Sequence, residues 1–445
     1  MRIAILGSGY VGLVSGASFA ELGHTVTCVD VDDSKIARLR RGEMTIFEPG
    51  LEEMVARNAA AGRLDFSTEI AGPVGDADVV FIAVGTPARQ GDGQADLSFV
   101  YAAADAIGRA MRGFTVVVTK STVPLGTGDE IERIIAKANP LARFAVASNP
   151  EFLREGVAIR DFMHPDRVVI GTADERARAV LAGVYQPLAE APLVFVSRRT
   201  AELIKYAGNA FLALKLTFIN EIADLCEATG VDVREVSNGI GMDRRIGAMF
   251  LNAGPGYGGS CFPKDTMALM KTARDYGVAL SLVETTSSIN DNRKRAMARK
   301  VIAACGGGVR DKKVAVLGLT FKPDTDDVRE APALSIIRAL QDYGATVSAY
   351  DPKGMEATAA LVGGVEFCAD AYAAAQDAAA VVIATEWSEF HALDFDALGT
   401  LMKERVVVDL RNMFETDEMA RRQFRYASVG RPEVVPELEI RQAAE

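Results

Sequence analysis

The first thirty residues hold the pattern that most restricts the fold of this chain. Residues 2–6, RIAIL, form a short apolar run that predicts a buried strand. The glycine-rich segment GSGYVG follows, and an apolar pattern at helical spacing then runs to Gly23. A second strand is predicted over HTVTCVD and ends at Asp30. This order of strand, glycine turn, helix and strand predicts a βαβ unit, and hence a parallel sheet.

The glycines of the turn, Gly7, Gly9 and Gly12, have the spacing G-x-G-x-x-G. The first two allow a tight turn and close approach of the backbone to a pyrophosphate, and the third lets the helix pack on the strand. Asp30 stands 18 residues after Gly12, where its carboxylate can accept hydrogen bonds from a ribose 2′-hydroxyl. Together with Asp32 it would repel a 2′-phosphate. We therefore expect an NAD site; the alternative is a glycine-rich turn without a ligand.

Three more strands are predicted in the first part of the chain, within residues 77–87, 114–124 and 143–152, and each ends in polar residues or a proline turn. Ligands of open parallel sheets bind beyond the carboxyl ends of the strands. The residues that we expect at this rim, where a nicotinamide would lie, are Thr86, Ser121, Thr122 and Glu151.

Composition argues against several classes of function. The chain has 445 residues, a length typical of two to three domains, and a formal net charge of −11, which argues against nucleic acid or an anionic membrane as the main partner. No apolar run is long enough to predict a membrane span. The five cysteines are far apart in the sequence, so we expect no disulfide framework, no metal site and a reducing cytoplasm. With only three histidines, we expect Lys, Asp, Glu or Cys to carry the acid–base chemistry.

Residues 200–229 predict one long helix, with Lys205 and Asn209 one turn apart on the same face. Gly208 costs about 1 kcal/mol relative to alanine in a helix, so we expect another group to approach it closely. The apolar stripe of this helix either supports a dimer or packs in the core, and both interpretations remain open. The stripe consists of Leu203, Ala207, Ala210, Leu214, Phe218, Ile222 and Leu225.

A second α/β unit is predicted after a linker at residues 305–313, with strands and helices in the same order as in the first. The G-x-G-x-x-G spacing is missing there, so we expect the same architecture with a different ligand. The segment LTFKPDTDDVRE carries Lys322 and Arg329, which suit a phosphate or a carboxylate unless they are merely solvated surface charges. The predicted fold class is α/β, with two Rossmann-like doubly wound parallel sheets joined by a long central helix and a helical dimerisation region.

Cys261 lies in the segment GYGGSCFPKD, between a glycine run and Pro263. Proline is favoured in the first turn of a helix, so the thiol is expected at a helix N-terminus beside Lys264. Both features lower the pKa of a thiol and raise its thiolate fraction. A lone cysteine is more often a small buried apolar residue. Combined with an NAD fold, however, a nucleophilic thiol can hold an aldehyde as a thiohemiacetal, which is oxidised to a thioester and then hydrolysed.

Six motifs, in this order, resemble those of the nucleotide-sugar 6-dehydrogenases, the UDP-glucose/GDP-mannose dehydrogenase family. They are GSGYVG, STVP, NPEFLREG, KYAGNAF, GYGGSCFPKD and FKPDTDDVRE. The chain departs from the family pattern at Phe47 in FEPGL, where tyrosine is frequent, and at Gly208, where alanine is usual. The resemblance implies an NAD-binding domain at residues 1–198, a central helical dimerisation and catalytic domain at 199–304, and a UDP-sugar-binding domain at 305–445. It also implies oxidation of UDP-glucose to UDP-glucuronate with two NAD and one water.

The resemblance also implies roles for particular residues. Cys261 corresponds to the nucleophile, Lys205 and Asn209 to the pair that stabilises the oxyanion, and Asp265 to the carboxylate that removes the hydroxyl proton with that lysine through a water. Glu151 and Thr122, with a water, correspond to the group that drives thioester hydrolysis. Implied cofactor contacts are Gly7, Gly9, Val11, Gly12, Asp30, Lys35, Thr86, Thr122, Glu155, Lys264 and Arg329. Implied substrate contacts are Glu151, Phe152, Leu153, Glu155, Lys205, Asn209, Arg245 from the partner subunit, Phe250, Leu251, Asn252, Ala253, Gly254, Gly258 and Lys322.

Three alternatives remain open. The substrate can be another nucleotide sugar, either GDP-mannose or a UDP-N-acetyl-hexosamine, because those relatives share the cysteine, lysine and asparagine. A two-electron β-hydroxyacid dehydrogenase also has Lys-x-x-x-Asn on a long helix after a Rossmann domain, but it has no use for Cys261. An NAD-binding sensor without catalysis would leave Glu151, Lys205 and Asp265 without a task.

Overall fold

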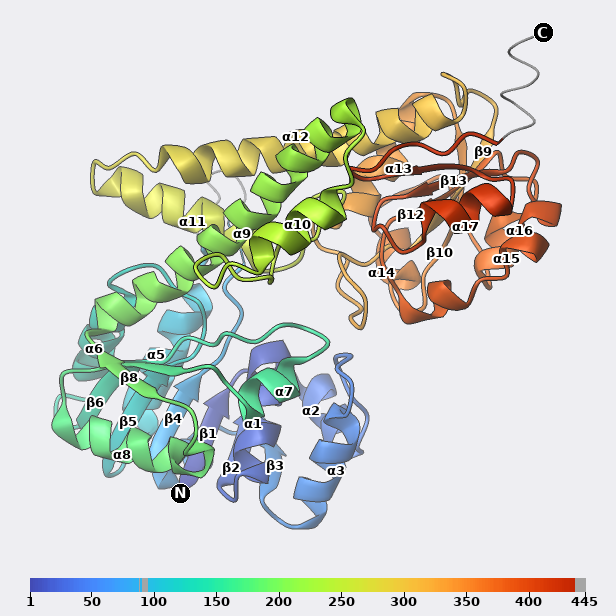
Figure 1. Ribbon diagram of the computed structural model, residues 1–445. Helices are drawn as coiled ribbons and strands as arrows, with labels where there is room; N and C mark the ends of the chain where they lie inside the picture. Colours follow the sequence, from blue (N-terminus) through green and yellow to red (C-terminus); the bar gives the residue numbers. More distant parts are fainter. Residues whose placement is uncertain (88, 90–94, 437–445) are drawn as a thin grey trace, which may run out of the picture. The chain divides into compact units, whose positions relative to one another are not determined.

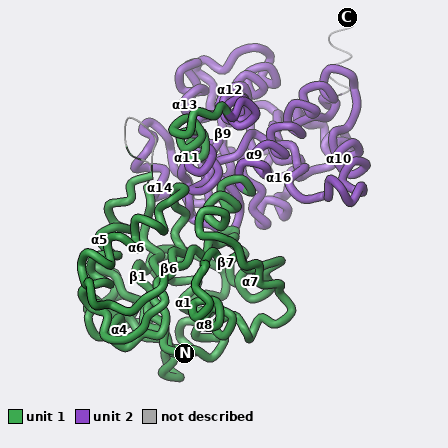
Figure 2. The backbone as a smooth tube through the Cα atoms, turned by 90° about the vertical axis from the view of Figure 1, so that its left-hand side faces the viewer, with its two compact units in different colours: residues 1–208, 267–279 green, residues 209–266, 280–445 purple. Residues whose placement is uncertain are grey.

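The computed structural model describes residues 1–87, 89 and 95–436. The chain folds into two compact units, which Figure 2 shows in different colours. The first unit comprises residues 1–208 and 267–279, and the second comprises residues 209–266 and 280–445, as far as they are described. Two helices, α9 (Arg198–Thr229) and α11 (Phe262–Asp275), contribute residues to both units.

The first unit is built on an eight-stranded sheet with the order β3-β2-β1-β4-β5-β6-β7-β8 (Figure 1). The neighbouring strands are parallel except at β6–β7, which pair antiparallel at Ser148 and Gly171. Strand β1 lies between β2 and β4, with Ile3 opposite Val26 on one side and Val79 on the other. The strand order therefore reverses between β1 and β4, where open α/β sheets bind their ligands. The strands are β1 (Arg2–Leu6), β2 (Thr25–Val29), β3 (Leu64–Ser67), β4 (Val79–Ile82), β5 (Phe114–Thr119), β6 (Arg143–Ser148), β7 (Val168–Gly171) and β8 (Leu193–Val196).

Helices cover both faces of this sheet, which explains why its strands are continuous apolar runs rather than alternating patterns. One core lies under α1, α3, α7 and α8, and the other lies under α4, α5 and α6. The helices are α1 (Tyr10–Glu21), α2 (Asp33–Arg40), α3 (Leu51–Ala60), α4 (Ala71–Asp76), α5 (Ser98–Ala110), α6 (Thr127–Ala138), α7 (Ala158–Met163), α8 (Glu175–Tyr185) and the 3₁₀ turn η1 (Gln186–Leu188).

The second unit repeats the architecture with a six-stranded parallel sheet of order β11-β10-β9-β12-β13-β14. Helices α12 and α13 share a core with one face of this sheet, and α15, α16 and α17 share a core with the other. The strands are β9 (Lys313–Leu317), β10 (Thr346–Tyr350), β11 (Val365–Phe367), β12 (Ala380–Ile383), β13 (Val406–Asp409) and β14 (Arg425–Ser428). The helices are α10 (Val233–Gly241), α12 (Ser281–Ala304), α13 (Pro332–Asp342), α14 (Met355–Ala359), α15 (Ala371–Ala375), η2 (Ser388–Ala392), α16 (Phe395–Leu401) and α17 (Thr416–Arg421).

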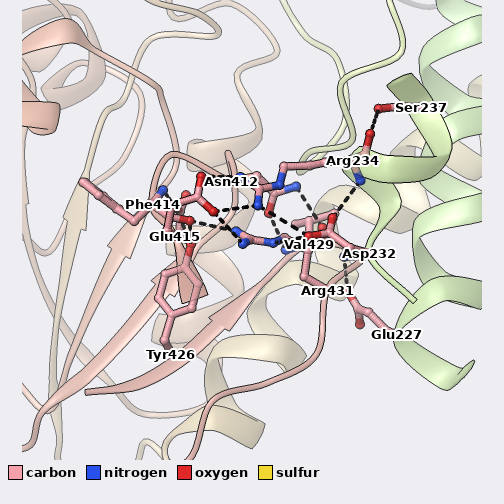
Figure 3. A network of polar contacts seen from close by, with 12 residues as sticks. Glu227, Asp232, Arg234, Ser237, Asn412, Phe414, Glu415, Tyr426, Val429 and Arg431 are labelled. Carbon is pink, nitrogen blue, oxygen red and sulfur yellow. Dashed lines mark hydrogen bonds and ion pairs between the residues drawn. The ribbon is translucent and has the colours of Figure 1, made fainter. Parts of the chain in front are cut away.

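The C-terminal half of α9 joins the core of this second sheet through Ile219, Ala223 and Cys226. A polar network holds the start of α10 against the same sheet (Figure 3). At its centre the guanidinium of Arg431, whose side chain is 1% exposed, donates to the carbonyl of Phe414 at 2.7 Å and pairs with Asp232 at 3.2 Å. Arg234 joins the network through a bidentate pair with Glu415. The helical segment after residue 208 is therefore built into the second unit.

Two expectations concern α9. A Cβ at Gly208 would meet no atom of the described residues within 4 Å, so no described group of the chain itself makes the close approach that we expected. Three members of the apolar stripe, Leu203, Phe218 and Leu225, are 44%, 47% and 59% exposed. Ala210 of the same stripe is buried, and Ile222 packs against the core of the second sheet, so the stripe is partly core and partly exposed. Its role in a dimer remains a prediction.

The predicted fold class is confirmed in its two doubly wound sheets and its long central helix of 32 residues, and the dimerising role of the helical region remains a prediction. The boundaries of a three-domain division at residues 198 and 304 remain a prediction.

Candidate active site

The glycine turn forms an open cradle at the carboxyl end of β1. Gly7 has a φ of +102°, and a Cβ on it would lie 2.5 Å from the carbonyl oxygen of Ala83. A Cβ on Gly12 would lie 1.8 Å from the carbonyl oxygen of Gly7. A Cβ on Gly9 would meet no protein atom within 4 Å, so that side of the turn is free for a ligand. The three glycines thus have the roles expected of a dinucleotide-binding turn.

Asp30, at the end of β2, gathers donors at the edge of this cradle. Its carboxylate accepts hydrogen bonds from the amides of Ser8 at 2.8 Å and Asp32 at 3.1 Å, and from the ammonium of Lys35 at 3.1 Å. The hydroxyl of Ser8 is buried and has no hydrogen-bond partner among the described residues. A negative acceptor beside an unpaired hydroxyl and an open glycine turn fits the ribose and pyrophosphate of NAD.

The corresponding position in the second sheet is closed. Asp351 follows β10 as Asp30 follows β2, but it is fully buried. Its Oδ2 accepts hydrogen bonds from the amides of Leu319 and Thr320, and its Oδ1 accepts from the amide of Gly354. A carboxylate whose acceptor positions are all used within the protein cannot bind a ribose. Despite the same strand order, the second sheet therefore lacks at this position the partly exposed carboxylate that Asp30 provides in the first.

The rim residues lie directly beyond three adjacent strands, as predicted. Thr86 follows β4, Thr122 follows β5 and Glu151 follows β6. The hydroxyl of Thr86 donates to the carbonyl of Thr122 at 3.1 Å, and the hydroxyl of Ser121 donates to the carbonyl of Val84 at 2.7 Å. These bonds join the β4 and β5 loops into one surface at the carboxyl end of the sheet.

Glu151 and Lys205 form a buried ion pair in the first unit. The distance between Glu151 Oε1 and Lys205 Nζ is 3.2 Å, and the two side chains are 5% and 4% exposed. The other oxygen of Glu151 accepts from the amide of Leu153 at 2.6 Å. The ring of Phe152 lies 5.4 Å from the Lys205 ammonium. The ion pair therefore joins the motif NPEFLREG to the first turns of α9. Each of the two buried charges is compensated by the other.

Lys120 is a residue of this site that the sequence analysis missed. It is buried beyond the end of β5, and its ammonium donates to Asn149 Oδ1 at 3.0 Å and to the hydroxyl of Tyr185 at 3.3 Å. Burial lowers the pKa of Lys120 to about 8. The amide of Asn149 in turn donates to the carbonyl of Val169 at 2.7 Å, which fixes the backbone two residues before Glu151. The sequence did contain a signal for this residue, because Lys120 directly follows the apolar strand run of residues 114–119.

In the second unit, Asn209 and Asp265 contact each other. The amide Nδ2 of Asn209 donates to Asp265 Oδ2 at 2.6 Å, and the ammonium of Lys264 donates to Asp265 Oδ1 at 2.8 Å. Asp265 is fully buried, and Asn209 is 7% exposed. The backbone amide of Asp265 donates to the carbonyl of Cys261 at 2.8 Å, which makes Cys261 the residue that opens α11. The predicted helix N-terminus at Cys261 is confirmed, and the residue is partly exposed.

The loop that leads to Cys261 packs against the segment FKPDTDDVRE. A Cβ on Gly258 would lie 2.3 Å from the carbonyl oxygen of Glu330, and one on Gly259 would lie 2.8 Å from the ring of Phe321. The amide of Gly259 donates to the carbonyl of Arg329 at 2.8 Å. The ammonium of Lys322 lies 5.8 Å from the Phe321 ring, and Arg329 forms a bidentate pair with Asp327. A residue with a Cβ could not come this close at positions 258 and 259. The packing of the loop therefore requires these two glycines of the motif GYGGSCFPKD, apart from any role in chemistry.

The segment Phe250–Gly254 is held by α12, for which the sequence analysis makes no prediction. Arg293 of α12 is buried and donates to the carbonyl of Gly254 at 2.7 Å. Asn290, one turn earlier, accepts from the amide of Tyr257 at 2.8 Å. Of the implied substrate contacts here, Leu251 and Ala253 are buried and Asn252 is exposed. Arg245 projects into solvent, with its side chain 89% exposed, and pairs with Asp243.

No group of three or more His, Cys, Asp or Glu residues in the described part of the chain is arranged to hold a metal ion. Within residues 1–87, 89 and 95–436, none of the helices has the length and apolar character that crossing a bilayer requires.

The fold, the dinucleotide cradle and the buried ionisable groups define an NAD-dependent dehydrogenase. Sequence models of three domains match the chain in order: the NAD binding domain at residues 1–189, the central domain at 199–292 and the UDP binding domain at 315–416. The chain belongs to the UDP-glucose/GDP-mannose dehydrogenase family. The resemblance seen in the six motifs is thereby confirmed, as is NAD as the cofactor.

Individual relatives cover nearly the whole chain. A UDP-glucose 6-dehydrogenase of Rhizobium meliloti is 62% identical over 437 residues, which are 97% of this chain and 100% of the relative. The structure of a UDP-glucose dehydrogenase from Pyrobaculum islandicum superposes with a TM-score of 0.89 at 42% identity, covering 96% and 97% of the two chains. The structure of a UDP-D-ManNAc dehydrogenase from Pyrococcus horikoshii gives a TM-score of 0.85 at 26% identity, covering 97% and 99%.

Proposed function

We propose that this enzyme oxidises C6 of UDP-glucose by four electrons to give UDP-glucuronate, using two NAD and one water and passing through a thioester on Cys261. The observation that carries the proposal is the arrangement around the start of α11. The partly exposed Cys261 opens the helix, and the buried Asp265, one turn into it, accepts a hydrogen bond from Asn209 of α9. The relative that is 62% identical over its full length, a UDP-glucose 6-dehydrogenase, supports the choice of sugar.

Bound NAD accepts a hydride in each of the two oxidations. In the first, Asp265 and Lys205 act through a water to remove the proton of the C6 hydroxyl, and the aldehyde forms as the hydride departs. Lys205 and Asn209 donate to the oxygen that becomes negative. An ammonium and an amide one helical turn apart suit that task, and both are buried, where such donors act most strongly.

The thiolate of Cys261 then adds to the aldehyde carbon and forms a thiohemiacetal. The second hydride departs from the same carbon, which leaves a thioester. A water attacks the thioester with help from Glu151 and Thr122, the C–S bond breaks, and the carboxylate and the thiol are released. A covalent bond to the chain is needed because a free aldehyde could leave between the two oxidations.

The remaining roles follow the family. Residues 250–254, Gly258 and Lys322 bind the nucleotide sugar with Phe152, Leu153 and Glu155, and Lys35, Lys264 and Arg329 bind the cofactor. GDP-mannose and UDP-N-acetyl-hexosamines are the alternative substrates. A two-electron β-hydroxyacid oxidation is the alternative reaction. The UDP-D-ManNAc dehydrogenase structure, at 26% identity, supports a UDP-N-acetyl-hexosamine as the substrate. This support is weaker than the support that the 62% identical relative gives to UDP-glucose.

We also propose that the enzyme acts as a homodimer in the cytoplasm. Exposed apolar residues of α9 support the dimer, because Leu203, Phe218 and Leu225 of the stripe, and Phe211 beside it, are each more than two-fifths exposed in the single chain. Large apolar side chains gathered along one helix mark an interaction surface. The side chain of Arg245 pairs with Asp243 in the loop after α10 and is 89% exposed, so it is accessible to a second subunit.

The test compares Cys261→Ala with Cys368→Ala, a matched control at a partly exposed cysteine of the second sheet. We expect the first variant to bind NAD normally but form no uronate, and the control to behave as the wild type. Uronate formed by Cys261→Ala at a near wild-type rate would exclude the thioester route. Rates with UDP-glucose, UDP-N-acetylmannosamine and GDP-mannose test the sugar, and a clear preference for either alternative would overturn that part of the proposal.

A further inference from the structure

Glu48 has a buried carboxylate to which the catalytic proposal assigns no task. It precedes α3 in the segment FEPGL and is 5% exposed. A glutamate is rarely buried unless its charge is compensated. Its compensation comes from donors that are far away in the sequence, so it is a link between segments rather than a local cap.

Three donors converge on the two oxygens of Glu48. The backbone amide of Gly156 donates to Oε2 at 2.6 Å, and that of Ala158 donates to Oε1 at 2.7 Å. The hydroxyl of Tyr10 donates to Oε2 and itself accepts from the amide of Gly156 at 3.2 Å. Ala158 is the first residue of α7, so the carboxylate satisfies an amide that the helix leaves without an internal partner.

Glu48 joins two segments that belong to the candidate active site, the dinucleotide turn and the loop that follows Glu151. Tyr10 stands between Gly9 and Val11 of the dinucleotide turn, at the start of α1. Gly156 directly follows Glu155, has a φ of +79°, and ends the motif that begins two residues before Glu151. A shift of the carboxylate would therefore move both the cofactor turn and the loop of residues 151–158.

The protonation state of Tyr10 suits this link. Burial raises the pKa of Tyr10, and the hydrogen bond to Glu48 raises it further, so the phenol keeps its proton over the working range. The hydroxyl group of a protonated phenol can donate its hydrogen to the carboxylate of Glu48. The oxygen of the same hydroxyl can at the same time accept a hydrogen bond from the amide of Gly156. The arrangement needs a hydrogen-bond acceptor on both oxygens of residue 48, because the two backbone amides and the phenol that face it are all donors.

We propose that Glu48 is a positioning residue that holds the dinucleotide turn and the loop of residues 151–158 in one arrangement, so that cofactor affinity and turnover both depend on it. The effect on turnover rests on the proposed roles of Glu151 and Glu155. The effect on cofactor affinity does not, because NAD binding is a property of the family. The side chain acts through Tyr10, Gly156 and Ala158 and touches neither reactant.

The experiment compares Glu48→Gln, Tyr10→Phe, the double variant and the control Glu52→Gln, an exposed glutamate in the first turn of α3. The dissociation constant of NAD is measured by calorimetry without a sugar substrate, and kcat and KM are measured with UDP-glucose. Glu48→Gln turns one acceptor into a donor that faces an amide. We expect it to weaken NAD binding and to lower kcat, each by about tenfold or more.

Tyr10→Phe should act in the same direction with a smaller effect, and the double variant should be no worse than Glu48→Gln, because both changes remove one shared bond. Glu52→Gln should match the wild type. Unchanged NAD affinity and unchanged kcat per folded molecule in Glu48→Gln, with only a lower melting temperature, would overturn the proposal. If Glu48→Gln does not fold, unchanged NAD affinity in Tyr10→Phe overturns it. A wild-type enzyme that binds NAD but ignores UDP-glucose would defeat the proposed function while leaving this test intact.

Discussion

The side-chain amide of Asn209 lies 2.6 Å from the carboxylate of Asp265, and both groups are buried. This bond orients the amide of α9 toward the helix that Cys261 opens. It also leaves the second amide hydrogen of Asn209 for another acceptor, since an amide nitrogen carries two. An oxyanion formed on a substrate is an acceptor of that kind.

Asn209→Ala should lower kcat with UDP-glucose by about 100-fold, because one oxyanion donor contributes about 3 kcal/mol to transition-state stabilisation. Steady-state kinetics at saturating NAD measures the effect. Asn238→Ala is the control, because that side chain is exposed in α10 and has no proposed role in binding or catalysis. A loss confined to KM would mean that the amide binds the ground state and the transition state equally well.

Lys120 predicts a pH dependence of stability. Burial lowers its pKa to about 8, so between about pH 8 and 10.5 the folded chain has released a proton that the unfolded chain still holds. Because the unfolded state binds more protons there, the free energy of unfolding contributed by this group rises with pH, by up to roughly 3 kcal/mol. Below about pH 8 both states are charged, and the cost of burying the charge is present in full.

The substitution Lys120→Met removes the titrating group. Denaturant unfolding of the wild type and of this variant, from pH 7 to 10.5, measures the free energy of unfolding of each protein. We expect the stability of the wild type relative to the variant to grow with pH across that window. A difference that stays constant with pH contradicts the assignment. Groups common to both proteins cancel in the comparison.

Gly208→Ala should stabilise the protein by about 1 kcal/mol, because alanine is the better helix former and its Cβ would meet nothing within 4 Å. Gly12→Ala is the matched contrast in α1, since its Cβ would lie 1.8 Å from a carbonyl oxygen. Chemical denaturation should give opposite signs for the two substitutions. A destabilised Gly208→Ala would mean that the open surface there is occupied in solution.

Arg431→Met should destabilise the second unit by about 3–5 kcal/mol, because the change leaves Asp232 and the carbonyl of Phe414 without their shared partner. Differential scanning calorimetry can measure the loss. Arg421→Met, at an exposed arginine of α17, should change stability by less than about 0.5 kcal/mol. Equal effects of the two substitutions would remove the argument that Arg431 organises this contact.

The sequence predicted what depends on local pattern. The cradle at Gly7–Gly12, the acid at Asp30 and the thiol at the start of α11 follow from spacing within one strand–turn–helix unit, and the structure contains each of them. At Gly208 the sequence shows the cost of a glycine in a helix but not the space around it. Whether the apolar stripe of α9 is buried depends on which of its sides meets other elements, which periodicity alone cannot decide.

The long-range contacts could not be predicted in this way. Lys120 meets Tyr185, and Glu48 meets Gly156, across 65 and 108 positions of the chain. Helix α12 buries Asn290 and Arg293 in order to hold the loop near Gly254, so its pattern is not that of a simple amphipathic helix. Such polar contacts between distant segments depend on the completed fold, and single-sequence reasoning has no access to them.

The central claim, that one sugar is oxidised twice without leaving Cys261, is tested most directly by counting NADH formed per UDP-glucose consumed in a reaction carried to completion. The account predicts two NADH per sugar and no free aldehyde. One NADH per sugar, with an aldehyde or ketone as the product, would contradict it.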